Sequence, residues 1–159
     1  MTDIVNLVIR DSRPDDEPFV LATAERLAAF EFPGWRTSQE IVAGELRTLR
    51  RFFAGSLPGS ALLVAAASPD DGLGFVLLET VRDYFSDTEH AHVGMLAVVE
   101  SAEGRRVGRA LLEAAERWAR TRGFSRLSLN VFDHNTRARS LYERLGYSPE
   151  TVRYVKVLA

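Results

Sequence analysis

The chain contains no cysteine among its 159 residues. This absence excludes disulfide bonds, thiolate metal sites and a cysteine nucleophile. An excess of positive charge is also missing, because 20 Lys and Arg residues are balanced by 22 Asp and Glu residues. General nucleic-acid binding requires a basic surface that displaces the counterions of phosphates, so the composition predicts no nucleic-acid partner.

Long hydrophobic runs are absent as well. No stretch approaches the roughly 18 apolar residues that a membrane span needs. The first ten residues carry an early acid and too short an apolar run for a signal peptide. We therefore expect no membrane association and a cytoplasmic location. Hydrophobic residues still make up 46% of the chain, and the length suits one domain over residues 1–159 with a single core.

The spacing of apolar residues predicts alternating strands and helices. Strands are expected at residues 6–10, 61–67, 73–81, 91–99 and 127–131, with one or two more within 146–158. Helices are expected at 17–30, from a capping box at 37–40 to 53, at 108–122 and at 136–144. Neighbouring strands followed by a strand–helix–strand unit indicate an α/β fold. We expect a mixed, largely antiparallel sheet of about six or seven strands, flanked by about four helices.

The most informative segment joins the strand that ends at 96–98 to the helix at 108–122. Its loop, residues 103–109, contains two glycines and three arginines. The start of a helix presents free N–H groups that suit phosphate, glycine lets the backbone approach an anion, and arginine adds charge. A solvated turn with surface arginines explains the same residues. The GxxxxGK[ST] and GxGxxG patterns are absent, so a nucleoside triphosphate or dinucleotide site is not indicated.

Two segments resemble those of GNAT-superfamily N-acetyltransferases. The first is Leu96-Ala97-Val98 followed by Gly104-Arg105-Arg106-Val107-Gly108-Arg109-Ala110-Leu111-Leu112, and it is similar to that family's acyl-CoA-binding segment. The second contains Leu129-Asn130-Val131, Asn135 and Leu141-Tyr142-Glu143-Arg144-Leu145-Gly146-Tyr147. The resemblance covers residues 91–147, whereas the first ninety residues match only in their order of elements. It implies a GNAT-like fold and direct acetyl transfer, in a ternary complex, from acetyl-CoA to a primary amine of a small molecule or peptide. No metal is implied.

The resemblance also implies a role for each matched position. Backbone groups of Leu96, Ala97 and Val98 would contact the pantetheine arm and polarise the thioester carbonyl, on a strand that splays away from its neighbour. The pyrophosphate would be wrapped by Glu103, Gly104, Arg105, Arg106, Val107, Gly108 and Arg109. Asn135 would contact the pantetheine arm, and Tyr142 would protonate the leaving thiolate. Core packing alone explains a tyrosine on an apolar helical stripe, and an N-cap alone explains Asn135.

The loop departs from the family pattern at two positions. Read without gaps, the usual Gln or Arg falls on Glu103, and the first of the paired glycines falls on Arg106. A register two residues later would restore Arg105 and Gly108. We prefer the ungapped register, because it keeps the spacing from the preceding strand and the phase of the helix. Arg106 then brings a guanidinium near the phosphates.

The general base is left open by the resemblance. Some peptide-acetylating relatives carry Glu at the position of Asn130, and an amide cannot take a proton from an ammonium. By placement, Glu79 and His92 are the candidate catalytic bases, with His90 and Glu89 as neighbours that could serve instead. Two histidines without a third ligand do not indicate a metal site.

Several readings stay open at this stage. A non-catalytic acyl-CoA-binding regulatory module and an acyltransferase for longer acyl groups are the alternatives to acetyl transfer. The acidic stretch 83–89 favours a cationic acceptor, and a solvated loop explains it equally well. A homodimer through a sheet edge or the C-terminal strand is compatible with the pattern.

Overall fold

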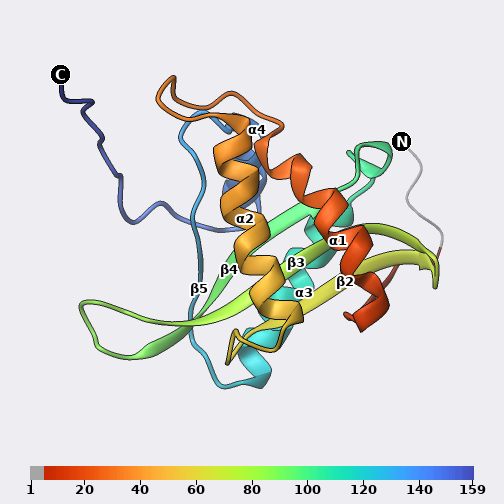
Figure 1. Cartoon of the computed structure of the whole chain (residues 1–159). Helices are drawn as coiled ribbons and strands as arrows, with labels where there is room; N and C mark the ends of the chain where they lie inside the picture. Colours follow the sequence, from red (N-terminus) through yellow and green to blue (C-terminus); the bar gives the residue numbers. More distant parts are fainter. Residues whose placement is uncertain (1–5) are drawn as a thin grey trace.

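A computed structural model of the chain describes residues 6–159. Figure 1 shows one sheet with helices on both faces, which confirms the expected α/β class. The strands are β1 (Val8–Asp11), β2 (Ala61–Ser68), β3 (Asp71–Arg82), β4 (Glu89–Val98) and β5 (Leu127–Leu129). The helices are α1 (Glu17–Thr23), α2 (Ser38–Phe53), α3 (Val107–Thr121) and α4 (Thr136–Arg144). In this described part, no helix is both long and apolar enough to cross a membrane.

The sheet follows the chain in the order β1-β2-β3-β4-β5. The first three pairs of neighbours are antiparallel, and β5 lies parallel to β4. A mixed, largely antiparallel sheet was expected, because the strands that follow one another directly can form hairpins, whereas β4 and β5 are joined through α3. The antiparallel β3–β4 pair is the longest ladder and forms the middle of the domain.

A β-bulge at Gly94 divides β4 into two parts. Leu77 of β3 pairs with Met95, and Leu78 pairs with Val93, so Gly94 is an extra residue on β4. An extra residue reverses the alternation of side chains along a strand. Val93 accordingly packs into one core, and Met95 packs into the other.

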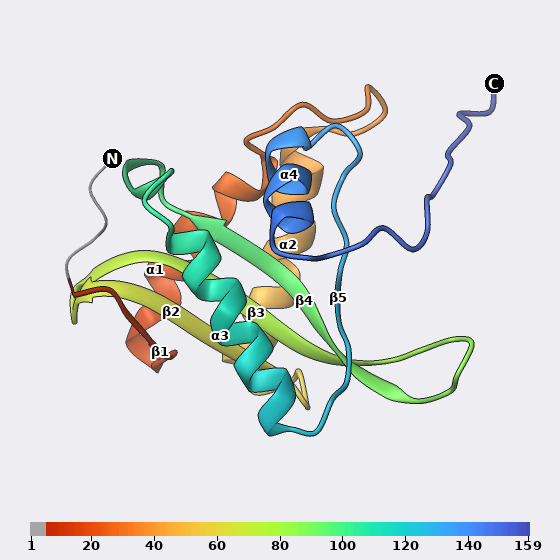
Figure 2. The ribbon, with the colours of Figure 1, turned by 180° about the vertical axis from the view of Figure 1, so that it is seen from behind.

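The sheet separates two hydrophobic cores. Helices α1 and α2 cover the face seen in Figure 1, over Val64, Phe75 and Leu77. On the opposite face, Leu111 and Leu112 of α3 pack on the sheet together with partly buried residues of α4 (Figure 2). Half of the capping box predicted for α2 is present: the Thr37 side chain accepts a hydrogen bond from the Glu40 N–H at 3.1 Å, whereas the Glu40 carboxylate accepts from Arg36 at 2.6 Å.

The first helix differs from its predicted span. It ends as an α-helix at Thr23 and continues only as a 3₁₀ turn over Ala24–Ala28. The Thr23 hydroxyl donates to the Phe19 carbonyl at 2.8 Å. Such a bond competes with the helical hydrogen-bond pattern and bends a helix, and 3₁₀ turns are common at helix ends.

The number of strands is the main correction to the predicted fold. Residues 6–159 form a five-stranded sheet, and the segment 146–158 contains no strand. Pro149 lacks the N–H group that a ladder requires, and the chain beyond it runs past β5 without pairing (Figure 1). The first five residues, where we expected no targeting segment, lie outside the described residues.

Candidate active site

The strands β4 and β5 separate partway along β4. They pair only at Ala91↔Leu127, His92↔Ser128 and Val93↔Leu129. Beyond Val93, β4 continues to Val98 and pairs only with β3. The backbone of Leu96, Ala97 and Val98 therefore has one edge that β5 does not use, and this is the strand segment expected to splay.

The loop before α3 folds tightly around two left-handed residues. Gly104 has a φ of 70°, and Arg106 has a φ of 63° immediately before the first residue of α3. A left-handed conformation favours glycine, because a Cβ there approaches the neighbouring carbonyl. The ungapped register had placed a family glycine at Arg106, and the backbone there has the conformation that suits glycine.

The first turn of α3 lies next to residues of both segments that resemble the GNAT family. A Cβ built on Gly108 would lie 3.8 Å from Val98 of β4 and 3.8 Å from Leu141 of α4. The N–H groups of a helix's first turn have no partner within the helix. The end of β4, the start of α3 and the middle of α4 thus surround one set of free backbone donors.

Glu103 fastens this loop to its surroundings. Its carboxylate forms ion pairs with Arg26 and with Arg137 of α4, the latter at 2.8 Å. The hydrogen bond from Arg137 is the main cause that lowers the pKa of Glu103, and Arg26 lowers it further. The Glu103 side chain is therefore engaged within the protein. The N–H groups of Glu103 and Arg105 donate to the carbonyls of Glu100 and Ala102 and fix the shape of the loop.

Helix α4 carries the two predicted residues of the second segment. Asn135 is its N-cap, and its side-chain oxygen accepts from the Ala138 N–H at 3.3 Å. Tyr142 is half-buried, and its ring contacts Tyr147 edge to face with the centroids 5.9 Å apart. Burial raises the pKa of the Tyr142 hydroxyl, so this group keeps its proton at neutral pH.

Glu79 and His92 come together on the opposite face, toward α2. They are direct partners across the β3–β4 ladder. His92 Nδ1 lies 2.8 Å from the Ser128 hydroxyl, and His90 Nε2 lies 2.9 Å from the same oxygen. Burial, with a smaller effect of His90, lowers the pKa of His92. His92 is therefore neutral at pH 7 and has a nitrogen that can accept a proton.

The carboxylate of Glu79 occupies the space over the bulge. A Cβ at Gly94 would collide with this carboxylate, so the absence of a side chain at Gly94 makes room for it. Burial raises the pKa of Glu79, and the charge of Arg51 partly opposes the effect. Glu45 of α2 also has a raised pKa, because of its burial and the negative charge of Glu79.

Sequence reasoning missed two members of this group, Glu45 and Ser128. Glu45 stands four residues from both Ile41 and Leu49, which are buried, so its position on the apolar stripe of α2 was visible in the sequence. Ser128 alternates with Leu127 and Leu129 along β5, but only the pairing with β4 brings it to the histidines. Across residues 6–159, no group of three potential ligands is placed to hold a metal ion.

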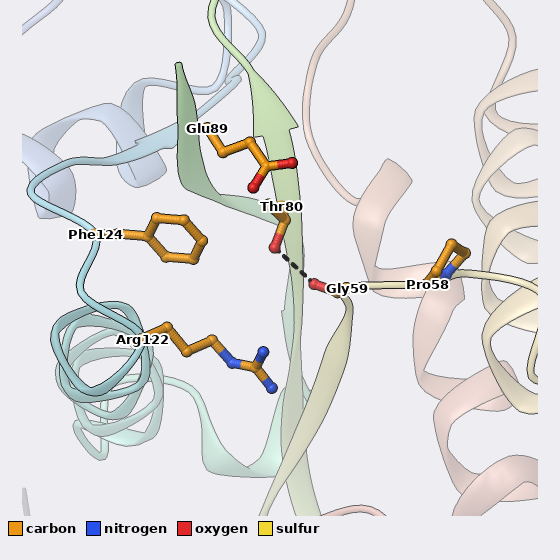
Figure 3. Close-up of a pocket in the computed structure, with 6 residues that line it drawn as sticks. All are labelled: Pro58, Gly59, Thr80, Glu89, Arg122 and Phe124. Carbon is orange, nitrogen blue, oxygen red and sulfur yellow. Dashed lines mark hydrogen bonds between the residues drawn. The ribbon is translucent and has the colours of Figure 1, made fainter.

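A separate hollow lies at the other end of α3 (Figure 3). It has a volume of about 550 Å³ and is lined by Pro58, Gly59, Thr80, Glu89, Arg122 and Phe124. The Thr80 hydroxyl donates to the Gly59 carbonyl at 2.8 Å across its wall. Glu89, which was considered as an alternative base, lines this hollow. The hollow lies by the C-terminal end of α3, whereas the loop at Gly104 precedes the N-terminal end of that helix.

In the acidic loop between β3 and β4, the carboxylate of Asp83 forms hydrogen bonds within the loop itself. One carboxylate oxygen of Asp83 accepts from the Ser86 N–H at 2.7 Å and from the Ser86 hydroxyl at 2.8 Å. These bonds, together with the nearby Arg126, lower the pKa of Asp83. The Asp83 carboxylate is therefore engaged within the loop.

Comparison with known proteins places this geometry in a family. The profile of the Acetyltransferase (GNAT) family matches residues 20–147. Mycothiol acetyltransferase of Rhodococcus erythropolis is 33% identical over 138 residues, which are 84% of this chain and 44% of that protein. Its counterpart in Beutenbergia cavernae is 40% identical over 83 residues, 52% of this chain and 28% of that protein. The chain thus spans less than half the length of these two relatives.

Other relatives are closer in size. An aminoglycoside N(6')-acetyltransferase type 1 of Klebsiella aerogenes is 32% identical over 104 residues, which are 63% of this chain and 68% of that protein. A putative acetyl transferase from Pyrococcus furiosus has a similar fold, with a TM-score of 0.77, 24% identity and coverage of 96% and 99% of the two chains. An aminoglycoside N-acetyltransferase in complex with CoA has a TM-score of 0.67 at 18% identity, covering 96% of this chain and 94% of that chain. From the family match over most of its length, we conclude that this chain belongs to the GNAT family of acetyltransferases.

Proposed function

We propose that the protein transfers the acetyl group of acetyl-CoA to a primary amine. The observation that carries the proposal is the convergence of the unpaired edge of Leu96–Val98 with the first turn of α3 and with α4. An edge of free backbone donors beside a helix N-terminus suits a ligand that has both amide groups and phosphates. The structure of an aminoglycoside N-acetyltransferase with CoA, which shares this fold, supports the choice of cofactor.

In this proposal the backbone does most of the cofactor binding. Residues Leu96, Ala97 and Val98 would bind the pantetheine arm, with Asn135 as a further contact. The amides of the loop 103–109 would bind the pyrophosphate. The guanidinium of Arg106 adds positive charge beside those amides. The Glu103 side chain, which is paired with Arg26 and Arg137, would hold the loop in shape.

The chemistry is a direct transfer within a ternary complex. The amine nitrogen forms a bond to the acetyl carbon, and the bond from this carbon to sulfur breaks. Backbone N–H groups of the Leu96–Val98 strand would stabilise the negative charge that develops on the carbonyl oxygen. The Tyr142 hydroxyl would donate a proton to the departing thiolate, and burial keeps this hydroxyl protonated until then.

The ammonium of the acceptor must lose a proton before it attacks. Glu79 and His92 are the groups that we propose for this step, because they face each other beside the point where β4 leaves β5. Burial makes Glu79 a stronger base than an ordinary carboxylate, and it keeps His92 neutral. The lowered pKa of His92 favours the form that accepts a proton at pH 7, whereas the raised pKa of Glu79 increases the basicity of its carboxylate.

The acceptor that fits this face is a cationic small molecule or peptide. Glu45 and Glu79 place two carboxylates on the α2 side of the sheet, and each has a pKa raised by burial. An ammonium group between them would relieve the cost of burying these charges. A cytoplasmic location and the absence of a nucleic-acid partner remain predictions from the composition.

The experiment that tests the proposal is a calorimetric titration of the purified protein with acetyl-CoA, with CoA and NAD as controls. We expect binding of both CoA species and none of NAD. A panel of primary amines, followed by the release of free thiol, then tests transfer. Failure to bind CoA would overturn the proposal, and CoA binding without turnover on any amine would favour a regulatory module.

A further inference from the structure

The hollow of Figure 3 takes no part in the reaction proposed above. Its lining residues come from the turn before β2, the end of β3, the start of β4 and the end of α3. Thr80 of this lining follows Glu79 on β3, and successive side chains of a strand point to opposite faces of a sheet. The hollow therefore lies on the α3 face, whereas Glu79 faces α2. Its volume of about 550 Å³ falls within the range of roughly 300–1,000 Å³ that is usual for small-molecule pockets.

Two walls of the hollow are held in place by contacts within the protein. The carbonyl of Gly59 accepts a hydrogen bond from the Thr80 hydroxyl at 2.8 Å, and Gly59 has a φ of 71°. A Cβ at Gly59 would lie 3.3 Å from Thr80, so glycine permits this close approach. On the other side, the ring of Phe124 packs on Trp118 with the centroids 6.2 Å apart. A site with walls fixed in this way loses little conformational freedom when a ligand binds.

The hollow contains one negative and one positive side chain that are not paired. Figure 3 shows Glu89 entering from β4 and Arg122 from the end of α3. Within residues 6–159, neither side chain forms a hydrogen bond or an ion pair. The guanidinium of Arg122 lies 4.6 Å from the centre of the Trp118 ring. Stacking of this kind holds a guanidinium by its face and leaves the N–H groups in its plane free to donate.

The two charges together select the kind of ligand. A guanidinium binds a carboxylate through two parallel hydrogen bonds, and the Glu89 carboxylate accepts hydrogen bonds from an ammonium group. A ligand with only a negative charge would be repelled by Glu89, and one with only a positive charge would be repelled by Arg122. The ring of Phe124 adds an apolar surface to the same lining. These groups suit a molecule with both charges and an apolar part.

We propose that the hollow is a binding site for a zwitterionic small molecule of the α-amino-acid class with an apolar side chain. Arg122 binds its carboxylate, Glu89 binds its ammonium group, and the side chain packs on Phe124. The ligand is distinct from the acetyl acceptor, because the hollow and Glu79 lie on opposite faces of the sheet. Thr80 is nevertheless the next residue after Glu79 on β3, so the two sites share one strand.

The first test is a calorimetric titration of the protein with L-phenylalanine, L-leucine and L-methionine. Phenethylamine and 3-phenylpropionate are the matched controls, because each keeps the apolar group of phenylalanine and lacks one of its two charges. We expect at least one of the amino acids to bind. For phenylalanine, removal of either charge should weaken binding at least about tenfold, since a hydrogen bond to a charged group is lost. No binding of the three amino acids at millimolar concentration, or equal binding of a singly charged analogue, would overturn the proposal.

The second test locates the bound amino acid by substitution. We expect Arg122→Gln and Glu89→Gln each to weaken binding at least about tenfold, because each removes one of the two charges. Arg117→Gln, which changes an exposed arginine on the same helix outside the lining, is the matched control and leaves the affinity unchanged. Glu79→Gln should also leave it unchanged. Loss of binding in Glu79→Gln but not in Arg122→Gln would place the amino acid in the acceptor site and overturn the proposal.

Fluorescence gives a local readout beside the hollow. The chain has two tryptophans, so Trp35→Phe leaves Trp118 as the only one. We expect the amino acid that binds to change the emission of Trp118, because the bound carboxylate alters the surroundings of the Arg122 guanidinium stacked on that ring. An unchanged emission at saturating concentration would contradict the proposal. None of these measurements involves acetyl-CoA, so this proposal and the proposed function can fail independently.

Discussion

The two sides of the splayed sheet differ in the kind of group that forms the proposed site: backbone on one side and side chains on the other. The proposed acetyl-CoA side consists mainly of backbone, in the Leu96–Val98 strand and the loop 103–109. The proposed acceptor side consists of titratable side chains that three separate elements supply: Glu45, Glu79, His90 and His92, bridged in part by Ser128. A site made of backbone requires a continuous run of residues with a particular shape, so it leaves a motif. A site made of side chains needs only the right residues at distant points, so it leaves none.

The largest expected effect comes from the acceptor side and separates its two candidate bases. We expect Glu79→Gln or His92→Gln, whichever removes the true base, to lower kcat by roughly 10²–10⁴-fold, the usual contribution of general base catalysis. Acetyl-CoA affinity should be unchanged, because neither residue lies on the cofactor side. Steady-state kinetics combined with the calorimetric titration provide the measurement. Glu45→Gln is the matched control, and we expect it to raise KM for the amine without a loss of this size in kcat.

The pH dependence identifies the base independently. The pKa of His92 is lowered below 6.5 by burial, so a His92 base is active at neutral pH and fails as the pH falls through that lowered pKa. The pKa of Glu79 is raised above 4.5, so a Glu79 base would also fail on the acidic side. The wild-type rate should therefore have an acidic limb, and only the variant that lacks the true base should lose this limb. If both variants retain the limb with normal kcat, neither residue is the base.

Most of the fold could be predicted from the sequence, because the apolar spacing of β2, β3, β4, α2, α3 and α4 matches the packing that each element makes. Two features could not. The bulge at Gly94 depends on the register between β3 and β4, and nothing local marks the residue at which a ladder gains one position. The C-terminal residues have the pattern of a strand, but a strand needs a neighbour, and no strand within residues 6–159 pairs with them.

The candidate site, like the fold, could be predicted from the sequence only in part. Gly104 and Arg106 lie in a contiguous loop, so the position of the turn followed from the sequence. Glu79 and His92 were chosen by their places near strand ends, and only the pairing shows that they face each other. Ser128 reaches the histidines only through the parallel pairing of β5, a contact between residues 36 positions apart in the sequence.

A smaller effect is expected from Tyr142→Phe, on the cofactor side of the comparison. This change removes the hydroxyl that we propose as the acid and keeps the ring that packs on Tyr147. We expect a loss of about ten- to a hundredfold in kcat, less than for the base, because a thiol with a pKa near 8.5 leaves more easily than an alcohol. Affinity for acetyl-CoA should stay within about twofold, since packing is retained. Unchanged turnover would show that this tyrosine serves packing alone.

The smallest effect tests whether the cofactor side depends on backbone shape. Gly104→Ala forces a side chain into a left-handed residue with φ of 70°, which costs about 1 kcal/mol. Gly55→Ala is the matched control, because Gly55 has a φ of 71°, lies beyond the end of α2 and has open space around it. Both variants should lose similar stability in thermal unfolding. Only Gly104→Ala should also weaken acetyl-CoA binding, by about tenfold if the altered turn misplaces even one amide donor, since 1.4 kcal/mol is a factor of ten. Equal affinity in the two variants would mean that the loop binds through its arginine side chains, and the contrast between a backbone-built and a side-chain-built half of the site would disappear.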